Sequence, residues 1–511
     1  MKETNTRMWD NMDQINKKHL LDCFPYNENY SPRVQQINIL FQIEQLLNQG
    51  KRFIIIQAPT GVGKSAISAS LLNYFQSGYV CTGKKTLQAQ YLKDFPFMKE
   101  VRGRSNFICK SSEDKTCDEG MCKKDKDFKC EYKPIYSESL GKLIWKQNQA
   151  EKCSYWVNKL DAIESPSVIH NYSYLVTESN YIGGFKQRDV LILDEGHNIE
   201  SVIMDFIDLD ITDQFLKSLN KYHKDKNFQF IKTDQKESNN YKLKLHAGWL
   251  FARNNDITET LNIIKTKKEE FKKREQEAKK ELERLNYTLE HRLYNRDDLE
   301  ELKILEDRIK SLKNFDTKPY EDLCNDENIL SSLQDHKLKF FLEHIHNELD
   351  NWVVKESFSS SSGNIYKLQF QPIFVSPYTE DTLFRLGKTV IIMSATVLNH
   401  SILAKNLGIP SDKIGYIEEK SFFPKENNLI FNLHLADFSY YDKDTLEDKE
   451  TFYSQVVERI DLILDLFYNE KGIIHCTSYE ILDYVLKHSI YTHRLISHDA
   501  SNREERLHEP F

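Results

Sequence analysis

The chain has 511 residues and a mass of 60.4 kDa, which is more than one hydrophobic core usually supports, so we expect about three or four domains. Its formal net charge is −8 and its pI is about 6.1. These values argue against a protein that coats nucleic acid by bulk electrostatics, so any contact with a polynucleotide must be local.

Hydrophobic residues make up 40% of the chain and charged residues 29%, the balance of a soluble globular protein. No uninterrupted apolar run has the length needed to cross a membrane. The residues after Met1 lack the basic and then apolar pattern of a secretory signal, so we expect an intracellular protein of the cytoplasm or nucleus that is not secreted. Disulfides are disfavoured in that reducing setting.

The first expected strand is Arg52–Gln57, a short run rich in β-branched residues. It leads into a glycine-containing loop and then into a helical pattern from Lys64 to Phe75. The order of strand, loop and helix matches a phosphate-binding loop, with alanine where the first glycine often stands. The predicted ATP-binding residues of this loop are Ala58, Pro59, Thr60, Gly61, Val62, Gly63, Lys64 and Ser65.

This loop can bind a nucleoside triphosphate because its backbone N–H groups curl around phosphate oxygens at a helix N-terminus. Lys64 is expected to pair with the β and γ phosphates, and the Ser65 hydroxyl to ligate Mg²⁺. A chance glycine-rich turn would require neither the strand before it nor the helix after it, so we interpret the segment as a nucleotide site.

Residues 106–156 are polar and lysine-rich, and few of their runs could form a core. Their cysteine spacing departs from the paired Cys-x-x-Cys of zinc ribbons. A zinc site is one interpretation, and an iron-sulfur cluster is the other, since no histidine accompanies the thiols. The candidate ligands, four of which would be needed, are Cys109, Cys117, Cys122, Cys130 and Cys153.

Basic and aromatic residues lie among these cysteines. Such a combination can follow a nucleic-acid backbone and stack on its bases, and a solvated loop is an equal alternative. The residues are Lys123, Lys124, Lys126, Phe128, Lys129, Tyr132 and Lys133.

A second apolar run, Asp189–Leu193, leads directly into an Asp-Glu-Gly-His box. Two adjacent carboxylates at a strand end are often a solvated cap, but downstream of a phosphate-binding loop they predict catalysis. Asp194 would hold Mg²⁺, and Glu195 would orient and deprotonate the water that attacks the γ phosphate. His197 would relay the nucleotide state to other motifs.

Residues 257–312 are densely charged, with leucines and isoleucines at helical spacing on either side of a break at 295–298. This pattern predicts two helices folded back as an antiparallel pair. A structural arm is the simpler interpretation, and a direct grip on nucleic acid is the alternative.

The third buried run, Thr389–Met393, is followed by Ser394, Ala395 and Thr396, which are candidates to couple ATP hydrolysis to movement. The same residues alone would suit a helix N-cap or turn. Three apolar strands with polar residues at their carboxyl ends predict a parallel α/β sheet.

After residue 424 a new α/β pattern begins, with Gly472–Ser478 as a strand and turn.

The order of these motifs resembles the XPD and DinG family of iron-sulfur helicases in superfamily 2, over most of the chain. Residues 31–36 are similar to the adenine-sensing motif of that family, with Arg33 and Gln36 at matching positions. Residues 103–109 resemble the segment with the first cluster cysteine, and residues 153–156 the segment with the last.

The resemblance implies a [4Fe-4S] cluster held by Cys109, Cys153 and two of the three cysteines between them. It also implies ATP-driven movement, 5′ to 3′, along single-stranded or forked DNA, with the cluster segment and the helical arm forming a passage for the strand. It points to no particular protein partner.

The expected fold is therefore α/β: a RecA-like P-loop NTPase motor domain with inserted iron-sulfur and helical arch domains, and a partial second RecA-like domain. The expected ranges are 1–105, 157–205 and 381–400 for the first motor domain, 106–156 for the cluster insertion, 206–380 for the arch and 401–511 for the second motor domain.

One feature of the family is missing. Its second motor domain ends with Gln-x-x-Gly-Arg-x-x-Arg, whose arginines stabilise charge at the γ phosphate. This sequence stops at Phe511 without that motif, where the second domain would be about half complete.

We weigh an ATP-dependent DNA helicase against an ATP-responsive single-strand DNA-binding module with little or no turnover. A third hypothesis makes the cysteines a redox or zinc-sensing switch.

Overall fold

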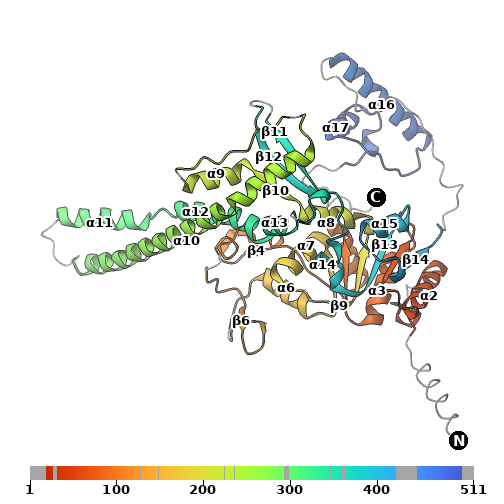
Figure 1. Ribbon diagram of the computed structural model, residues 1–511, viewed down its shortest axis with the longest axis horizontal. Helices are drawn as coiled ribbons and strands as arrows, with labels where there is room; N and C mark the ends of the chain where they lie inside the picture. The colour runs from red at the N-terminus through yellow and green to blue at the C-terminus, as the bar shows by residue number, and fades with distance from the viewer. Residues whose placement is uncertain are drawn as a thin grey trace, which may run out of the picture. The chain divides into compact units, whose positions relative to one another are not determined.

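The computed structural model describes residues 19–26, 31–125, 128–147, 149–223, 225–234, 236–292, 299–345, 347–359, 363–421 and 446–497 (Figure 1). The chain divides into two compact units, Met1–Ser421 and Phe422–Phe511.

A seven-stranded sheet forms the centre of the first unit. Its spatial order is β14-β1-β13-β9-β2-β8-β3, and every neighbouring pair is parallel. The strands are β1 (Phe53–Gln57), β2 (Gly78–Thr82), β3 (Lys99–Glu100), β8 (Ser167–Asn171), β9 (Arg188–Asp194), β13 (Gly387–Ser394) and β14 (Ile414–Glu418).

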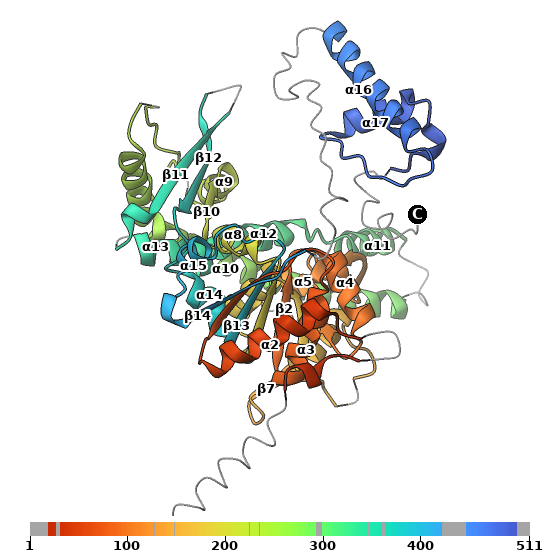
Figure 2. The ribbon, with the colours of Figure 1, turned by 90° about the vertical axis from the view of Figure 1, so that its right-hand side faces the viewer.

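Both faces of this sheet are buried. Successive strand residues point to opposite sides, so one strand contributes to two cores. Ile54 and Ile56 of β1 pack in one core, and Phe53 and Ile55 pack in the other. The first face is covered by α2 (Val34–Asn48), α3 (Lys64–Phe75) and α4 (Lys85–Asp94), as Figure 2 shows for α2 and α3. The second is covered by α6 (Ser154–Glu164), α7 (Tyr172–Thr177) and α8 (Ile199–Ile207). The predicted α/β fold is confirmed.

The end of the first motor domain differs from the predicted range. We placed the start of the second domain at residue 401, but α15 (His400–Asn406) is followed by β14, which pairs in parallel with β1. Gly415 of β14 also lies against the side chain of Leu46 in α2. The large sheet is therefore complete only at residue 418, because the partly buried strand β14 supplies one of its edges.

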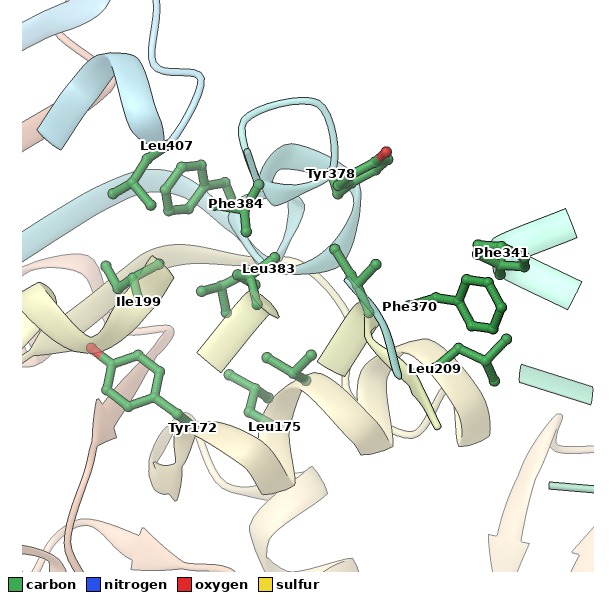
Figure 3. Packing of buried hydrophobic residues seen from close by; sticks show 14 of the residues in the cluster. Tyr172, Leu175, Ile199, Leu209, Phe341, Phe370, Tyr378, Leu383, Phe384 and Leu407 are labelled. Carbon is green, nitrogen blue, oxygen red and sulfur yellow. The ribbon is translucent and has the colours of Figure 1, made fainter. Parts of the chain in front are cut away.

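A second sheet occupies part of the range predicted as a helical arch. It is antiparallel, in the order β10 (Leu209–Thr212), β12 (Ile365–Pro372) and β11 (Trp352–Phe358). Its residues Leu209 and Phe370 share one continuous core with Tyr172 and Ile199 on α7 and α8, as Figure 3 shows. The helical arm is thus connected to a sheet that packs against α7 and α8.

The arm itself is a helical hairpin, as predicted. Its helices are α10 (Asn239–Arg292, 54 residues) and α11 (Leu299–Lys313), and an ion pair between Arg308 Nε and Glu281 Oε1 (3.2 Å) joins them. The predicted break at 295–298 lies outside the described residues. At 1.5 Å per residue α10 is about 80 Å long. Despite that length, none of the helices that the structure describes could span a membrane.

Shorter elements complete the first unit. The helices α9 (Asp213–Tyr222), α12 (Lys318–Ser332) and α13 (Lys339–Ile345) lie in the arm region, and α14 (Thr379–Thr382) precedes β13. The cysteine segment contains β4 (Ile108–Cys109), β5 (Ser112–Thr116), α5 (Met121–Lys124), β6 (Ile135–Ser137) and β7 (Lys142–Ile144).

The second unit is described from residue 446 to 497. Helix α16 (Leu446–Leu466) packs on α17 (Tyr479–His488) through Val457, Ile481 and Val485. The strand predicted at Gly472–Ser478 is not formed, since no other segment among the described residues of this unit pairs with it. The predicted second RecA-like domain accordingly remains a proposal.

Contacts at Gly387 predict a stability effect. A Cβ atom there would lie 2.5 Å from Leu191 Cβ and 2.7 Å from the Thr389 carbonyl oxygen, so the start of β13 would have to shift. We expect Gly387→Ala to lower the free energy of unfolding by about 1–3 kcal/mol. Gly248→Ala, in an open helical position of α10, should raise it by about 0.5–1 kcal/mol. Thermal unfolding midpoints of both variants test this, and equal midpoints would contradict the close packing of β13 on β9.

Candidate functional site

Three strands of the large sheet end at the same level. Gln57 at the end of β1 pairs with Ser394 at the end of β13. Met393, one residue earlier, pairs with Asp194 at the end of β9. The Ala58 N–H then donates to the Ser394 carbonyl (2.9 Å), so the loop leaves the sheet in contact with β13. The phosphate-loop, Asp-Glu-Gly-His and Ser-Ala-Thr segments therefore meet at one edge, where α/β sheets bind ligands.

The loop after β1 has the backbone shape that its glycines allow. Gly61 and Gly63 have φ angles of +88° and +86°, in the left-handed region where a side chain is strained. Lys64 is the first residue of α3, and its Nζ donates to the Ala58 carbonyl (3.3 Å). The ammonium group thus lies back across the loop, as a phosphate-binding lysine requires.

The remaining residues of the phosphate loop differ in how far they are buried. Ala58 and Val62 are buried in the core beneath the loop, and Thr60 is exposed. Pro59 and Ser65 are half-buried. The loop is therefore anchored from below by apolar groups, while its outer side remains accessible to a ligand.

The first turn of α2 holds the loop from the other side. The Gln36 side chain is buried, and its Nε2 donates to the Gly63 carbonyl (3.1 Å). Its Oε1 accepts from the Arg33 backbone N–H (2.9 Å), and the Arg33 guanidinium donates to the Gly61 carbonyl. Both residues of the predicted adenine-sensing motif thus contact the predicted phosphate loop.

Asp194 is almost completely buried beside this loop. Its Oδ1 accepts from the Glu195 N–H (3.0 Å), and its Oδ2 accepts from the Tyr91 hydroxyl (3.1 Å). Burial raises the pKa of Asp194 above its usual value, and the nearby Lys64 ammonium opposes that rise. Sequence reasoning missed Tyr91, because a tyrosine within a helix gives no motif signal.

Glu195 has a left-handed backbone, with φ of +55°. Such a conformation costs a non-glycine residue on the order of 1–2 kcal/mol and is often found where a side chain must be aimed. The next residue packs closely on β13, since a Cβ at Gly196 would lie 2.3 Å from Ile392 Cγ2. The Glu195 carboxylate lies 3.4 Å from His197 Nδ1 and is part-exposed, so a ligand at the sheet edge can reach it.

His197 joins the Asp-Glu-Gly-His box to the Ser-Ala-Thr segment, 197 residues away in the chain. Its Nδ1 is 3.0 Å from the Ser394 hydroxyl, and the direction of this bond depends on the imidazole tautomer. The same hydroxyl lies 3.0 Å from the Thr396 carbonyl and 3.2 Å from the Thr396 N–H. Ala395, between them, is half-buried. The Ser-Ala-Thr segment is therefore a compact turn in contact with the Asp-Glu-Gly-His box.

The five cysteines of the insertion gather around one apolar cluster. Cys109, Cys117 and Cys153 are buried with Tyr155 and Trp156. The Sγ atoms of Cys117 and Cys153 are 3.8 Å apart, and no cysteine among the described residues forms a disulfide.

Cys122 and Cys130 complete the set at its half-buried margin. Burial raises the pKa of the Cys130 thiol, and the thiols of Cys122, Cys153 and Cys109 raise it further, so they lie near Cys130. Burial, followed by the nearby Cys153 thiol, raises the pKa of Cys117. No three His, Cys, Asp or Glu side chains in the described part of the chain are placed to hold a single metal ion.

The predicted nucleic-acid-binding residues of the insertion differ in their exposure. Lys123, Lys129 and Phe128 are exposed, whereas Tyr132 packs against the cysteine cluster. Lys133 instead places its Nζ 5.5 Å from the centre of the Trp156 ring. Lys126 lies outside the described residues. Lys124 is half-buried, so Lys123, Phe128 and Lys129 are the most accessible of the predicted residues that the structure describes.

The insertion also contacts the arm through a buried carboxylate. Asp125, directly after α5, is 3.1 Å from Lys268 Nζ and 3.3 Å from Lys272 Nζ, both on α10. The Tyr320 hydroxyl of α12 donates to the same carboxylate. Lys268 also pairs with Glu327 (2.7 Å). Two insertions that are separate in sequence therefore share a charged and fully paired boundary.

The parallel sheet, the loop between β1 and α3, and the carboxylates after β9 define the class of a P-loop nucleotide-binding α/β protein. Residues 29–208 match the family model described as the res subunit of type III restriction enzymes. The chain is also 24% identical to a probable ATP-dependent helicase of Methanocaldococcus jannaschii, an alignment that covers 92% of this chain and 73% of that protein. The predicted likeness to ATP-dependent helicases is thus confirmed.

Solved structures of XPD align with most of the chain. One titled XPD helicase has 15% identity and a TM-score of 0.42, with 90% of this chain and 75% of that chain covered. Another, titled truncated XPD, has 12% identity and a TM-score of 0.39, with 76% and 100% covered. These superpositions are loose, and the fold rests on the sheet topology itself.

The contact between Gln36 and the loop gives a test of the site. A Cβ at Gly63 would lie 2.4 Å from Gln36 Nε2, so Gly63→Ala must displace the glutamine and reshape the loop. We expect the Kd for an ATP analogue to rise at least about tenfold, equivalent to 1.4 kcal/mol. Gly50→Ala is the matched control, since Gly50 also has a positive φ (+76°) but has open space around it. Equal affinities in the two variants would contradict the loop geometry.

Proposed function

We propose that this protein is an ATP-dependent DNA helicase that translocates 5′ to 3′ on single-stranded DNA. The carrying observation is the shared sheet edge, where Asp194 and Ser394 end β9 and β13 and Lys64 follows the loop after the adjacent β1. The similarity to a probable ATP-dependent helicase supports the activity. The direction of movement and the preference for single-stranded or forked DNA rest on the motif resemblance.

In this proposal Mg²⁺ and ATP bind at the carboxyl ends of β1, β13 and β9 in the large sheet. Lys64 neutralises the β and γ phosphates, while the Ser65 hydroxyl and the Asp194 carboxylate hold Mg²⁺. The contacts of Arg33 and Gln36 with the loop support a role in sensing the adenine base, because a nucleotide that orders these side chains also orders the loop.

Glu195 is the proposed general base. It accepts a proton from a water molecule whose oxygen attacks the γ phosphorus, and the bond to the ADP oxygen breaks as the new bond forms. His197 lies between Glu195 and Ser394, so a change at the γ phosphate can be passed to the Ser394–Thr396 turn. This contact supports the proposed coupling of hydrolysis to movement.

The cysteine insertion is proposed to hold a [4Fe-4S] cluster. Such a cluster takes four thiolates that surround a core larger than one ion, which fits several buried, unbridged thiols gathered in one apolar cluster. Cys109, Cys117, Cys122, Cys130 and Cys153 are the candidates, and one of them is spare. When bound, the cluster supplies a structural crosslink to a segment that has little core of its own.

The nucleic-acid path is proposed to run along the insertion and the arm. Exposed Lys123 and Lys129 with Phe128 suit a backbone and a base face, respectively. The paired boundary at Asp125 holds this segment against α10 and α12. The resemblance to XPD and DinG proteins favours a passage for one strand between these parts.

The function is tested by strand separation. We expect ATP to drive the unwinding of a duplex with a 5′ single-stranded overhang and not of one with a 3′ overhang. Glu195→Gln should still bind ATP but unwind about 10²–10⁴-fold more slowly, since a general base is lost. Glu200→Gln, five residues further on and hydrogen-bonded to Asn406, is the matched control.

The other outcomes are also informative. Unwinding only from a 3′ overhang would contradict the proposed direction. ATP-sensitive binding of single-stranded DNA without hydrolysis would favour the alternative function, an ATP-responsive DNA-binding module.

The cluster is tested by iron and sulfide analysis of anaerobically purified protein. We expect about four iron atoms for each chain, because four thiolates hold a [4Fe-4S] cluster. Single Cys→Ser changes at the five candidates should lose iron in four cases and retain it in one. Cys476→Ser, in the second unit, should keep the full content. Zinc in place of iron, or five variants with unchanged iron, would rule out the cluster.

A further inference from the structure

The hydroxyl of Tyr91, on α4, lies in the proposed nucleotide site, although Tyr91 is 103 residues from Asp194 in the chain. It is only 2% exposed, and its hydroxyl lies 3.1 Å from Asp194 Oδ2 and 3.1 Å from Ser68 Oγ. Its ring packs near Phe95, the residue directly after α4, with the ring centres 6.3 Å apart. One hydroxyl therefore connects α3, α4 and the end of β9.

The direction of these hydrogen bonds follows from the donors available. An ionised carboxylate only accepts, so Tyr91 gives its single proton to Asp194 Oδ2. Ser68 then donates either to the Tyr91 oxygen or to the Lys64 carbonyl (3.2 Å).

The two oxygens of Asp194 are thereby fixed in different ways. Oδ1 is held by the Glu195 N–H of its own strand end, and Oδ2 is held by Tyr91 from a separate helix. Each oxygen has a further lone pair for a cation or a cation-bound water. Without the hydroxyl, the carboxylate could rotate about its χ2 torsion, which is broad for aspartate.

We propose that Tyr91 is a positioning residue for the divalent cation of the nucleotide: it aims the Asp194 carboxylate at Mg²⁺ and links α4 to that cation. The inference rests on the proposed function only in assigning Mg²⁺–ATP to this sheet edge. Partners that orient a ligating carboxylate are worth about 10–100-fold in metal affinity when removed. A purely structural tyrosine would contribute to stability and leave the cation dependence unchanged.

The test is Tyr91→Phe, which keeps the ring and removes only the hydroxyl. Binding of a fluorescent ATP analogue is titrated against Mg²⁺ concentration in the full chain, and ATP hydrolysis is measured over the same range. We expect the Mg²⁺ concentration for half-maximal binding to rise about tenfold. The rate at saturating Mg²⁺ should stay within about threefold of wild type, since excess cation restores the occupied site.

Two control variants separate positioning from packing. Tyr79→Phe removes another buried tyrosine hydroxyl, which donates to the Lys186 carbonyl (2.9 Å) and does not contact Asp194. Ser68→Ala removes the second partner of the Tyr91 hydroxyl but leaves its bond to Asp194. Both should keep the Mg²⁺ dependence of wild type within about threefold.

An unchanged Mg²⁺ dependence in Tyr91→Phe would overturn the inference. An equal shift in Ser68→Ala would also overturn it, because the effect would then report a general disturbance between α3 and α4. The binding titration needs no strand separation, so wild-type protein that binds Mg²⁺–nucleotide but unwinds no DNA would refute the helicase proposal and leave this test valid.

Discussion

The parallel ladder of β1, β13 and β9 is the constraint on which the candidate site depends. Parallel strands present their carboxyl ends at one edge, so residues far apart in sequence meet wherever the register is level. Gln57 Oε1 accepts from the Val397 N–H (3.0 Å) across 340 residues of chain, and Ala58 bonds to Ser394 beside it. A register slip of even one residue would separate the loop, the carboxylates and the Ser394 turn.

The two large insertions leave this edge intact because they lie in crossover connections between strands. The three-stranded sheet at the base of the arm continues the core on one face of the large sheet, since Leu209 and Phe370 belong to the same cluster as Tyr172 (Figure 3). Asp125 pairs with Lys268 of α10 and so joins the cysteine insertion to the same arm. The arm therefore contacts both the core on one face of the large sheet and the cysteine segment.

The features that sequence predicts best are those with strong local signals. Glycines at fixed spacing and a run of isoleucines predict the loop and β1, and the helix from Lys64 to Phe75 begins and ends as predicted. β14 was assigned to the wrong domain because a short run with Gly415 shows no preference for either sheet. Tyr91 and Asp125 were missed because their roles come from long-range packing, which leaves no periodic or motif pattern.

ATP hydrolysis with and without single-stranded DNA tests the central claim most directly, in anaerobically prepared wild type, Lys64→Ala and the control Lys51→Ala. Lys51 donates to the Asp412 carbonyl (2.8 Å), away from the loop. The account predicts hydrolysis that rises with DNA in wild type and Lys51→Ala and falls to background in Lys64→Ala. Hydrolysis that persists in Lys64→Ala would contradict it, because the nucleotide would then be turned over outside the edge formed by β1, β13 and β9.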